Sequence, residues 1–279
     1  MPKFAKPDRR PILTIAFGRQ RVGKTVLLNT MAQFYRARGC SVQVWNADQQ
    51  NRSHSLSTFF PDAKTVPQGG LDDGKAWIED RFSEMVMTRC DAVLDIGGGA
   101  TSFARLASEV PLLAATEESG ILVVGMFVTG PEKADLDYLE QFSAVGSLPD
   151  STAVVMNEGL ISSERSAAFA YASVLQHPAV EGVVAKGGET VLFPAMTCMS
   201  RVCDLGVGFV DASNGVASPG VEPLGMFDRM RVNRWWSRDV PSFFRLLPQD
   251  WIPLEARQTD GKTQGASTEA LAESATAAE

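Results

Sequence analysis

The stretch Gly18-Arg19-Gln20-Arg21-Val22-Gly23-Lys24-Thr25 decides the fold class of this chain, because it matches G-x-x-x-x-G-K-[ST] at every fixed position. The apolar segment 11–17 before it is typical of a buried strand, and segment 26–32 after it is typical of a helix. A strand, a glycine-bearing loop and a helix in this order are the context in which the pattern binds phosphate. We therefore predict a phosphate-binding loop between the first strand and the first helix.

The fixed positions of this loop have separate chemical roles. Its glycines let backbone N–H groups turn inward around an anion, and the N-terminus of the following helix adds positive potential. Lys24 is expected to reach the β- and γ-phosphates, and the Thr25 hydroxyl is expected to bind Mg²⁺. The nucleotide-binding residues predicted here are Gly18, Arg19, Gln20, Arg21, Val22, Gly23, Lys24, Thr25 and Val26.

Length and composition fit a cytoplasmic α/β protein. The chain has 279 residues, of which 44% are hydrophobic, and this suits one α/β domain with additions or two small domains. It has no secretory segment at the N-terminus and no run of about eighteen apolar residues, so neither export nor a membrane span is predicted. The net charge of −7 does not favour a nucleic-acid footprint over the whole molecule, but it leaves room for a local basic patch.

Strand and helix patterns alternate along most of the chain. Apolar or β-branched runs predict strands, and residues with helical spacing predict the helices between them; the strands fall at 42–46, 91–95, 121–128, 153–156 and 190–193. This alternation predicts a three-layer α/β fold, with a mostly parallel central sheet flanked by helices. We divide the chain into an N-terminal arm, a P-loop domain, an arginine- and aromatic-rich helical segment and a disordered tail, with bounds 1–10, 11–224, 225–252 and 253–279.

A second acidic residue is needed near the loop to hold Mg²⁺ through water. Asp95 ends an apolar strand and is followed by three glycines, which is the layout of a Walker B strand and a flexible loop. Backbone N–H groups near Gly98 are expected to approach the γ-phosphate, because glycine permits close contact. The alternative role for Asp95 is that of a helix N-cap. Asp91, at the start of the same strand, is expected to face solvent.

The segment 42–50 resembles the second-strand motif D-x-D-x-Q of the ParA/MinD family of deviant-Walker ATPases. Asp48 matches the second acid of that motif and Gln50 its glutamine, and Asp95 matches the family's Walker B acid. Asn157 resembles the asparagine that reads the adenine edge, and Pro194 resembles the strand-end proline that closes the base pocket. The resemblance covers roughly residues 10–215 with these landmarks in the family's order.

This resemblance implies ATP and Mg²⁺ as cofactors, with Thr25, Asp95 and Asp48 at the metal and Asp48 orienting the attacking water. It also implies slow turnover raised by a partner protein, and a nucleotide-dependent homodimer. The sequence departs from the family at the loop. Arg19 replaces the signature lysine that reaches the partner subunit's nucleotide, and a guanidinium suits that role because it binds phosphate well.

Two further departures bear on the dimer and on catalysis. Gln20 and Arg21 replace two glycines and add bulk where two loops would meet, so an altered face-to-face dimer is expected. Asn46 replaces the first acid of D-x-D, while Asp48 keeps the position of the hydrolytic acid. The alternative interpretation of Asp48 is a turn-forming residue after a strand.

Residues 226–247 combine aromatic side chains with arginines and have three interpretations. As an amphipathic helix, the segment would rest on an anionic membrane surface. Its arginines would otherwise contact DNA phosphates, or the helix would simply pack on the domain with its arginines solvated. Pro241 is expected to break the helical run. The location predicted is cytoplasmic, with nucleoid or membrane-surface association depending on this segment.

Three functions remain open from the sequence. The first is a ParA/MinD-like ATPase switch in plasmid partition, maintenance or conjugation, or in positioning a cellular structure. The second is a P-loop small-molecule kinase or synthetase of the dethiobiotin-synthetase type, which shares the fold. The third is a nucleotide-binding adaptor that does not hydrolyse, which is consistent with Gln20, Arg21 and Asn46.

Overall fold

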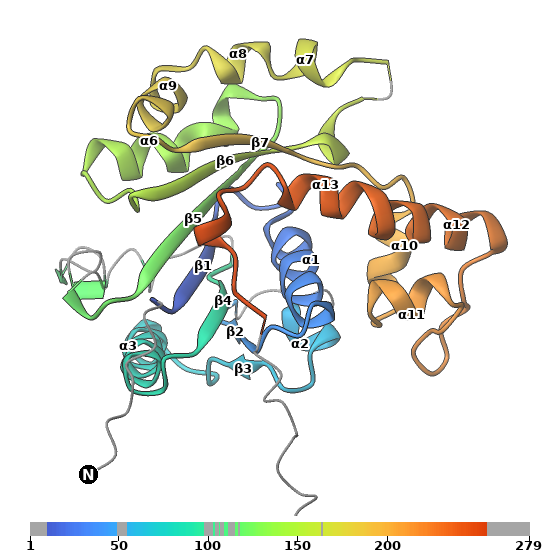
Figure 1. Ribbon diagram of the computed structural model, residues 1–279, viewed down its shortest axis with the longest axis horizontal. Helices are drawn as coiled ribbons and strands as arrows, with labels where there is room; N and C mark the ends of the chain where they lie inside the picture. Colours follow the sequence, from blue (N-terminus) through green and yellow to red (C-terminus); the bar gives the residue numbers. More distant parts are fainter. Residues whose placement is uncertain are drawn as a thin grey trace, which may run out of the picture.

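The computed structural model describes residues 10–48, 55–97, 103, 106, 109–110, 115–116, 118–162 and 164–255. In this part of the chain, a seven-stranded sheet has the order β3-β2-β4-β1-β5-β6-β7, and every neighbouring pair is parallel. The strands are β1 (Ile12–Phe17), β2 (Val42–Asn46), β3 (Lys64–Thr65), β4 (Asp91–Asp95), β5 (Leu122–Thr129), β6 (Ser151–Asn157) and β7 (Glu189–Phe193). The predicted parallel α/β sheet is confirmed (Figure 1).

Helices cover both faces of the sheet and give the fold its three layers (Figure 1). One face is covered by α1 (Lys24–Ala37), α2 (Leu56–Phe59), α10 (Met199–Asp204), α11 (Phe209–Ser213), α12 (Met226–Arg234) and α13 (Val240–Phe244). The other is covered by α3 (Leu71–Thr88), α6 (Asp137–Ala144), α7 (Ala167–Ala170), α8 (Ala172–Leu175) and α9 (Pro178–Ala185). Short 3₁₀ turns η1 (Lys133–Leu136), η2 (Glu158–Leu160) and η4 (Gln249–Trp251) connect these elements.

The central strand β1 is buried on both faces, as its continuous apolar run predicts. Ile12 and Ala16 point into the core beneath α1, whereas Leu13, Ile15 and Phe17 point into the core beneath α3 and α6. β1 lies between β4 and β5, so the strand order reverses direction at this point. In open α/β sheets such a switch point opens a crevice at the carboxyl ends of the strands. The loop after β1 therefore lies where a ligand can enter.

Asp91 is buried rather than facing solvent, so that expectation is wrong. Its Oδ1 accepts a hydrogen bond from the backbone N–H of Ile12 at 2.9 Å. The carboxylate thus supplies an acceptor for the first N–H of the central strand, which would otherwise be buried without one.

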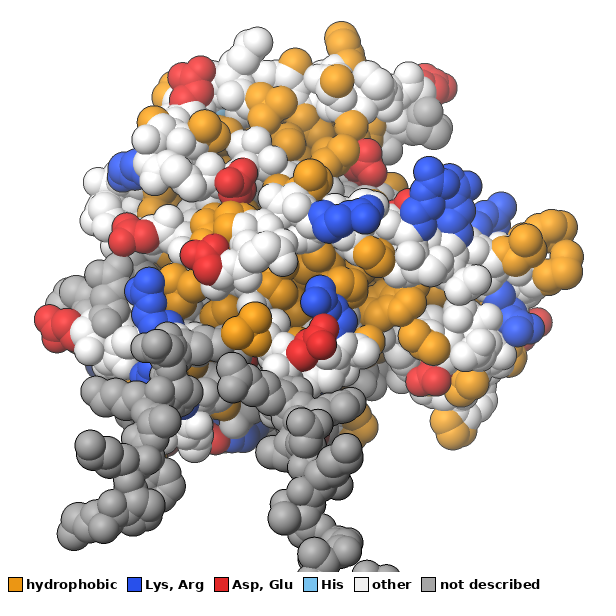
Figure 2. All heavy atoms as spheres, viewed as in Figure 1, with side chains coloured by type: hydrophobic (Ala, Val, Ile, Leu, Met, Phe, Trp, Pro, Cys, Tyr) orange, Lys and Arg blue, Asp and Glu red, His pale blue; other side chains and the backbone are white. Residues whose placement is uncertain are grey.

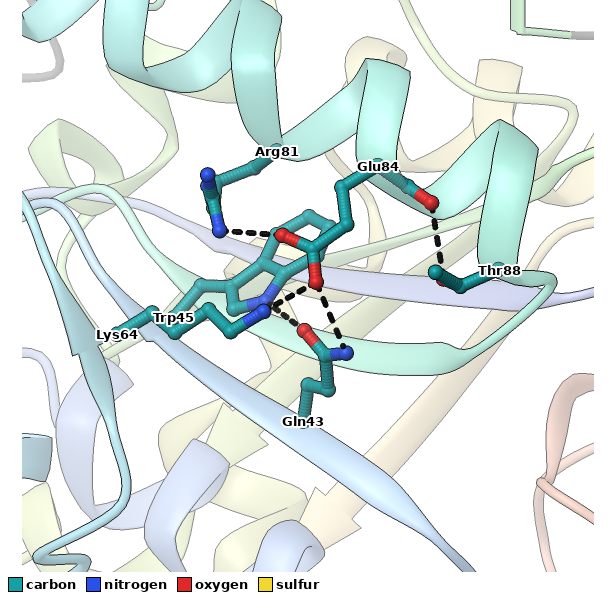
Figure 3. Close-up of polar contacts among 6 residues, drawn as sticks. All are labelled: Gln43, Trp45, Lys64, Arg81, Glu84 and Thr88. Atoms are coloured by element: carbon teal, nitrogen blue, oxygen red, sulfur yellow. Dashed lines mark hydrogen bonds and ion pairs between the residues drawn. The ribbon is translucent and has the colours of Figure 1, made fainter.

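A network of polar side chains fastens α3 to the edge strand β3 and its neighbour β2 (Figure 3). Glu84 of α3 accepts hydrogen bonds from Lys64, Arg81 and Gln43, and Gln43 Oε1 accepts one from Trp45 Nε1 at 2.8 Å. The hydrogen bond from Lys64 is the main cause that holds the pKa of Glu84 below its usual range, with Gln43 and the two nearby cations adding to it. The short strand β3 is therefore held by side chains as well as by its ladder to β2.

The C-terminal segment packs against the domain as one continuous helix. α12 passes through a π-helical turn, η3 (Trp235–Asp239), into α13, and the helix continues through Pro241, which lies directly after the π turn and donates no backbone hydrogen bond. The expectation that Pro241 breaks the run is therefore wrong. The buried side chains Val232, Trp235, Val240, Phe243 and Phe244 belong to the core beneath α1, and the Phe244 ring stacks on Phe34 of α1 with centroids 3.9 Å apart. In the described residues no helix has the length and apolarity to cross a bilayer.

Candidate functional site

The loop between β1 and α1 has the backbone conformation that its glycines allow. Gly18 has φ 133° and Gly23 has φ 100°, both in the region that favours glycine. A Cβ added to Gly18 would lie 2.4 Å from the Val128 carbonyl oxygen, and one added to Gly23 would lie 2.4 Å from Asn157 Nδ2. Both fixed glycines of the motif are therefore required by conformation and by close packing.

Arg21 also has a left-handed backbone, with φ 66°, although it is not glycine. For an L-residue with a Cβ this conformation costs roughly 1–2 kcal/mol, because Cβ approaches the following carbonyl oxygen. Gln20 and Arg21 are exposed, and both line the cavity at the loop. The ParA/MinD motif that the sequence resembles has glycines at these two positions, so the loop keeps a glycine-like shape at Arg21 without the glycine.

Lys24 starts α1 with its ammonium group inside the loop. Its Nζ donates to the carbonyl oxygens of Gly18 at 2.9 Å and Arg19 at 2.7 Å, and the side chain is buried. Burial lowers the pKa of Lys24, while the negative charges of Asp95 and Asp48 act in the opposite direction. The ammonium is thus placed at the mouth of the loop, with two carboxylates nearby.

Thr25 and Asp95 meet across the carboxyl ends of β1 and β4. The Thr25 hydroxyl donates to Asp95 Oδ2 at 2.7 Å, and the Gly97 N–H donates to Oδ1 at 3.1 Å. Burial raises the pKa of Asp95, and the hydrogen bonds from Thr25 and Gly97 oppose that rise. A hydroxyl beside a carboxylate matches the oxygen ligands of Mg²⁺, which usually keeps several waters and binds substrate phosphates as well. The residues present therefore fit a Mg²⁺–nucleotide.

Asp48 lies close to this pair, and Asn46 holds its backbone. The Asn46 Oδ1 accepts a hydrogen bond from the Asp48 N–H at 3.1 Å, while its Nδ2 donates to the Ser57 hydroxyl at 2.9 Å. A Cβ added to Gly97 would lie 2.9 Å from Asp48 Cγ, so the carboxyl group lies directly against the backbone that follows Asp95. Sequence reasoning treated Asn46 only as a lost acid. The N-x-D pattern after a strand was the signal of an Asx turn that could have revealed its role.

A cavity of about 590 Å³ opens beside the loop and falls within the usual size of small-molecule sites. One wall consists of the predicted site residues Gln20, Arg21, Gly23, Lys24, Thr25, Val26 and Asp48, together with Gly97, which was not predicted. The other wall comes from α1, α2 and α10 and consists of Asn29, Phe59, Met199, Ser200 and Cys203. Sequence reasoning missed this second wall because no local motif marks it and its helices are distant in sequence.

Six predicted residues that the structure describes lie outside the lining of this cavity, namely Gly18, Arg19, Val22, Asp95, Asn157 and Pro194. Arg19 is exposed and its Nη1 lies 3.4 Å from Asp135 Oδ1. Asn157 Nδ2 donates to the Val22 carbonyl at 2.8 Å, and the Pro194 carbonyl accepts from Trp235 Nε1 at 3.0 Å. Asn157 thus supports the phosphate-binding loop directly, and Pro194 is fastened to the C-terminal helix. Gly98, Gln49 and Gln50 lie outside the described residues.

The parallel sheet, the switch point and the glycine loop with its buried lysine together define a P-loop nucleotide-binding fold. No protein-family model and no curated protein matches the chain. Similar solved structures include the MinD cell division protein of Aquifex aeolicus, with 14% identity and a TM-score of 0.43 over 82% of this chain and 97% of that chain.

Two other similar structures come from further proteins. The cell division protein FtsY of Thermotoga maritima has 14% identity and a TM-score of 0.42, over 81% of this chain and 69% of that chain. The signal recognition particle 54 kDa protein of Aeropyrum pernix K1, solved with GDP, has 14% identity and a TM-score of 0.41, over 86% and 49% of the two chains. Identities and scores this low leave the function to be argued from the site itself.

Proposed function

We propose that this chain is a nucleotide-dependent switch that binds a nucleoside triphosphate with Mg²⁺ and hydrolyses it slowly. The observation that carries the proposal is the convergence of the Lys24 ammonium, the Thr25–Asp95 pair and Asp48 on one cavity at the switch point of the sheet. The base is proposed to be adenine and the class the ParA/MinD type, both on the sequence resemblance at Asp48, Asn157 and Pro194.

Each residue of the site has its own role in the proposed reaction. The loop N–H groups and Lys24 bind and orient the phosphates, and such positioning supplies most of the catalysis in phosphoryl transfer. Thr25 Oγ1 and the Asp95 carboxylate would hold Mg²⁺, which would supply neutralisation of the phosphate charge. Asp48 accepts a hydrogen bond from the attacking water and so directs the water oxygen at the γ-phosphorus. Its turn is held by Asn46, so the carboxylate reaches the site pre-oriented.

The outward face of residues 226–247 is the proposed contact surface for a partner. Met226, Phe227 and Met230 are 65%, 67% and 62% exposed, beside the exposed arginines Arg229, Arg231, Arg234, Arg238 and Arg245. Figure 2 shows basic and apolar side chains exposed together at the end of the molecule where α12 lies. DNA phosphates or an anionic membrane surface fit this chemistry. A switch that carries such a surface fits plasmid partition, maintenance or conjugation, or the positioning of a cellular structure, with a partner protein that stimulates turnover.

A second candidate is supported by the far wall of the cavity. Phe59, Met199 and Cys203 are apolar, and Ser200 and Asn29 add polar groups, so this wall resembles a binding surface for a small acceptor. The corresponding function is a P-loop kinase or synthetase acting on a small molecule. Such an enzyme would turn over with its acceptor and without any macromolecule.

Calorimetry with Mg-ATP and Mg-GTP tests binding, and phosphate release tests turnover with the protein alone, with DNA and with anionic vesicles. We expect ATP binding by the wild type, a loss of binding in Lys24→Ala, and turnover raised by DNA or vesicles. Sedimentation with ADP and with ATP tests the homodimer. Folded protein that binds no Mg-nucleotide would refute the proposal. Binding without turnover under every condition would favour a non-hydrolysing adaptor.

A further inference from the structure

We propose that Arg21 is a catalytic arginine that acts in cis, on the γ-phosphate bound by its own chain. This proposal rests on the proposed nucleotide hydrolysis and adds a residue to it. Arg21 stands where the family motif has glycine, so its side chain is a feature of this chain rather than of the motif.

The first support is the backbone of Arg21. Its φ of 66° lies in the left-handed region, which glycine adopts without strain and a residue with a Cβ does not. Non-glycine residues in this region cluster at ligand-binding and catalytic sites, where the surrounding structure holds them. Arg21 is held there within a loop whose neighbours Gly18 and Gly23 are themselves locked by packing against Val128 and Asn157.

The second support is the position of its side chain relative to the loop's other cations. Arg21 lines the same cavity as Lys24, Asp48 and Gly97. Lys24 already donates to two loop carbonyls, and Arg19 is turned to Asp135 and does not line the cavity. No hydrogen bond or ion pair joins the Arg21 guanidinium to the residues that the structure describes. The loop carries three cations, Arg19, Arg21 and Lys24. Among the described residues, Arg21 is the one that lines the cavity and has no hydrogen bond or ion pair from its guanidinium.

The proposed role of Arg21 follows from the place where negative charge develops during hydrolysis. During hydrolysis the water oxygen bonds to the γ-phosphorus while the bond to the β–γ bridging oxygen breaks, giving nucleoside diphosphate and inorganic phosphate. One proton of the water stays on the phosphate and the other is released to solvent. Negative charge grows on the bridging oxygen and on the γ-phosphoryl oxygens, and a guanidinium stabilises it with paired N–H donors. Arg21 supplies this cation from the same chain, so hydrolysis does not need a cation from a second subunit.

Two variants of Arg21 and a matched control test the proposal. Arg21→Gly removes the side chain and relieves the backbone, so it is expected to fold at least as well as the wild type. We expect its Kd for Mg-ATP to stay within about threefold while kcat falls by about 1,000-fold or more, the scale of catalytic arginines. Arg21→Lys is expected to recover part of kcat, because it restores the charge without the paired donors.

The control is Arg89→Gly. Arg89 also has a left-handed φ, 56°, but its guanidinium donates to the carbonyls of Ser119 and Gly120 and does not line the cavity. This variant is expected to leave kcat unchanged, which separates relief of backbone strain from loss of the catalytic cation.

Mixing experiments test whether Arg21 acts on the nucleotide that its own chain binds. Arg21→Gly mixed with binding-deficient Lys24→Ala is expected to recover no activity, and wild-type kcat is expected to be independent of protein concentration. Recovery in the mixture would overturn the cis assignment. Wild-type-like kcat in Arg21→Gly, with an active wild type, would overturn the proposal while leaving the proposed function intact. A wild type that binds no nucleotide, or never hydrolyses it, would overturn both.

Discussion

Replacing Asn157 with alanine tests whether this side chain supports the phosphate-binding loop or reads the base. Its Nδ2 donates to the Val22 carbonyl at 2.8 Å, and its Oδ1 accepts from the Gly159 N–H at 2.9 Å. The same Nδ2 packs so closely on Gly23 that no Cβ would fit there. The side chain thus joins the end of β6 to the loop just before Lys24.

Asn157→Ala leaves a carbonyl of the loop without its buried donor, which costs about 1–3 kcal/mol. We therefore expect the free energy of unfolding, measured in urea, to fall by that amount. If the same loosening acts on the phosphate-binding conformation, a loss of about 1.4 kcal/mol in binding corresponds to tenfold in Kd. This loss should be equal for Mg-ATP, Mg-GTP and inorganic triphosphate, because all three share the phosphate tail.

Calorimetry with these three ligands decides between the two roles, and Asn233→Ala on the exposed face of α12 is the matched control. A loss confined to one nucleoside triphosphate, with inorganic triphosphate bound as in the wild type, would refute the loop-support role. It would instead favour the base-reading role that the sequence resemblance implies.

Three further changes have defined outcomes. Lys24→Ala should lose about 1.5–3 kcal/mol of nucleotide binding, one to two decades in Kd by calorimetry, because charged hydrogen bonds to phosphate are removed; unchanged affinity would remove Lys24 from the site. Asp48→Ala should bind Mg-ATP but release no phosphate, and normal turnover would show that the hydrolytic assignment of Asp48 is wrong. Glu84→Gln should lower the free energy of unfolding by about 1 kcal/mol at neutral pH. Because the folded state holds the pKa of Glu84 below its unfolded value of about 4.3, this difference should persist above that pH and vanish as the pH falls through the lowered folded pKa. A difference that grows toward acid pH in urea titrations would contradict it.

The sequence predicts the fold, and it also marks the centre of the candidate site, because those signals are local. The loop from Gly18 to Thr25 carries its own conformational requirements, and Asp95 is marked by the end of an apolar strand. The parallel topology then brings β1 and β4 side by side, so Thr25 and Asp95 meet without any further signal. The sequence does not reveal which side chains a helix far along the chain places in the cavity. α10 supplies a cavity wall only because the chain crosses over after β7.

The π-helical turn in the C-terminal segment shows a second kind of failure. A regular helical period over Val232, Trp236, Val240 and Phe243 places Trp236 on the buried face, whereas the structure buries Trp235 in its place and leaves Trp236 half-buried. A π turn accommodates an extra residue, so the buried face advances from Val232 to Trp235 and then to Val240. A sequence pattern with a period of 3.6 residues does not predict this shift of the buried face. The prediction for Asp91 failed for a related reason, since its buried carboxylate accepts a hydrogen bond from the Ile12 N–H, which only the fold brings beside it.

The packing of the C-terminal helix connects the proposed nucleotide site to the exposed arginines of α12. α1 begins with Lys24 in the phosphate site, and further along it Phe34 stacks on Phe244 of α13. α10 lines the cavity with Met199, Ser200 and Cys203, while Arg201 of the same helix pairs with Asp228 of α12. Close-packed interiors transmit displacement because they have little free volume to absorb it. A ligand that moves α10 therefore also acts on the Arg201–Asp228 pair, which lies beneath the exposed arginines of α12. Such a connection between the nucleotide site and the exposed arginines is what the proposed switch requires.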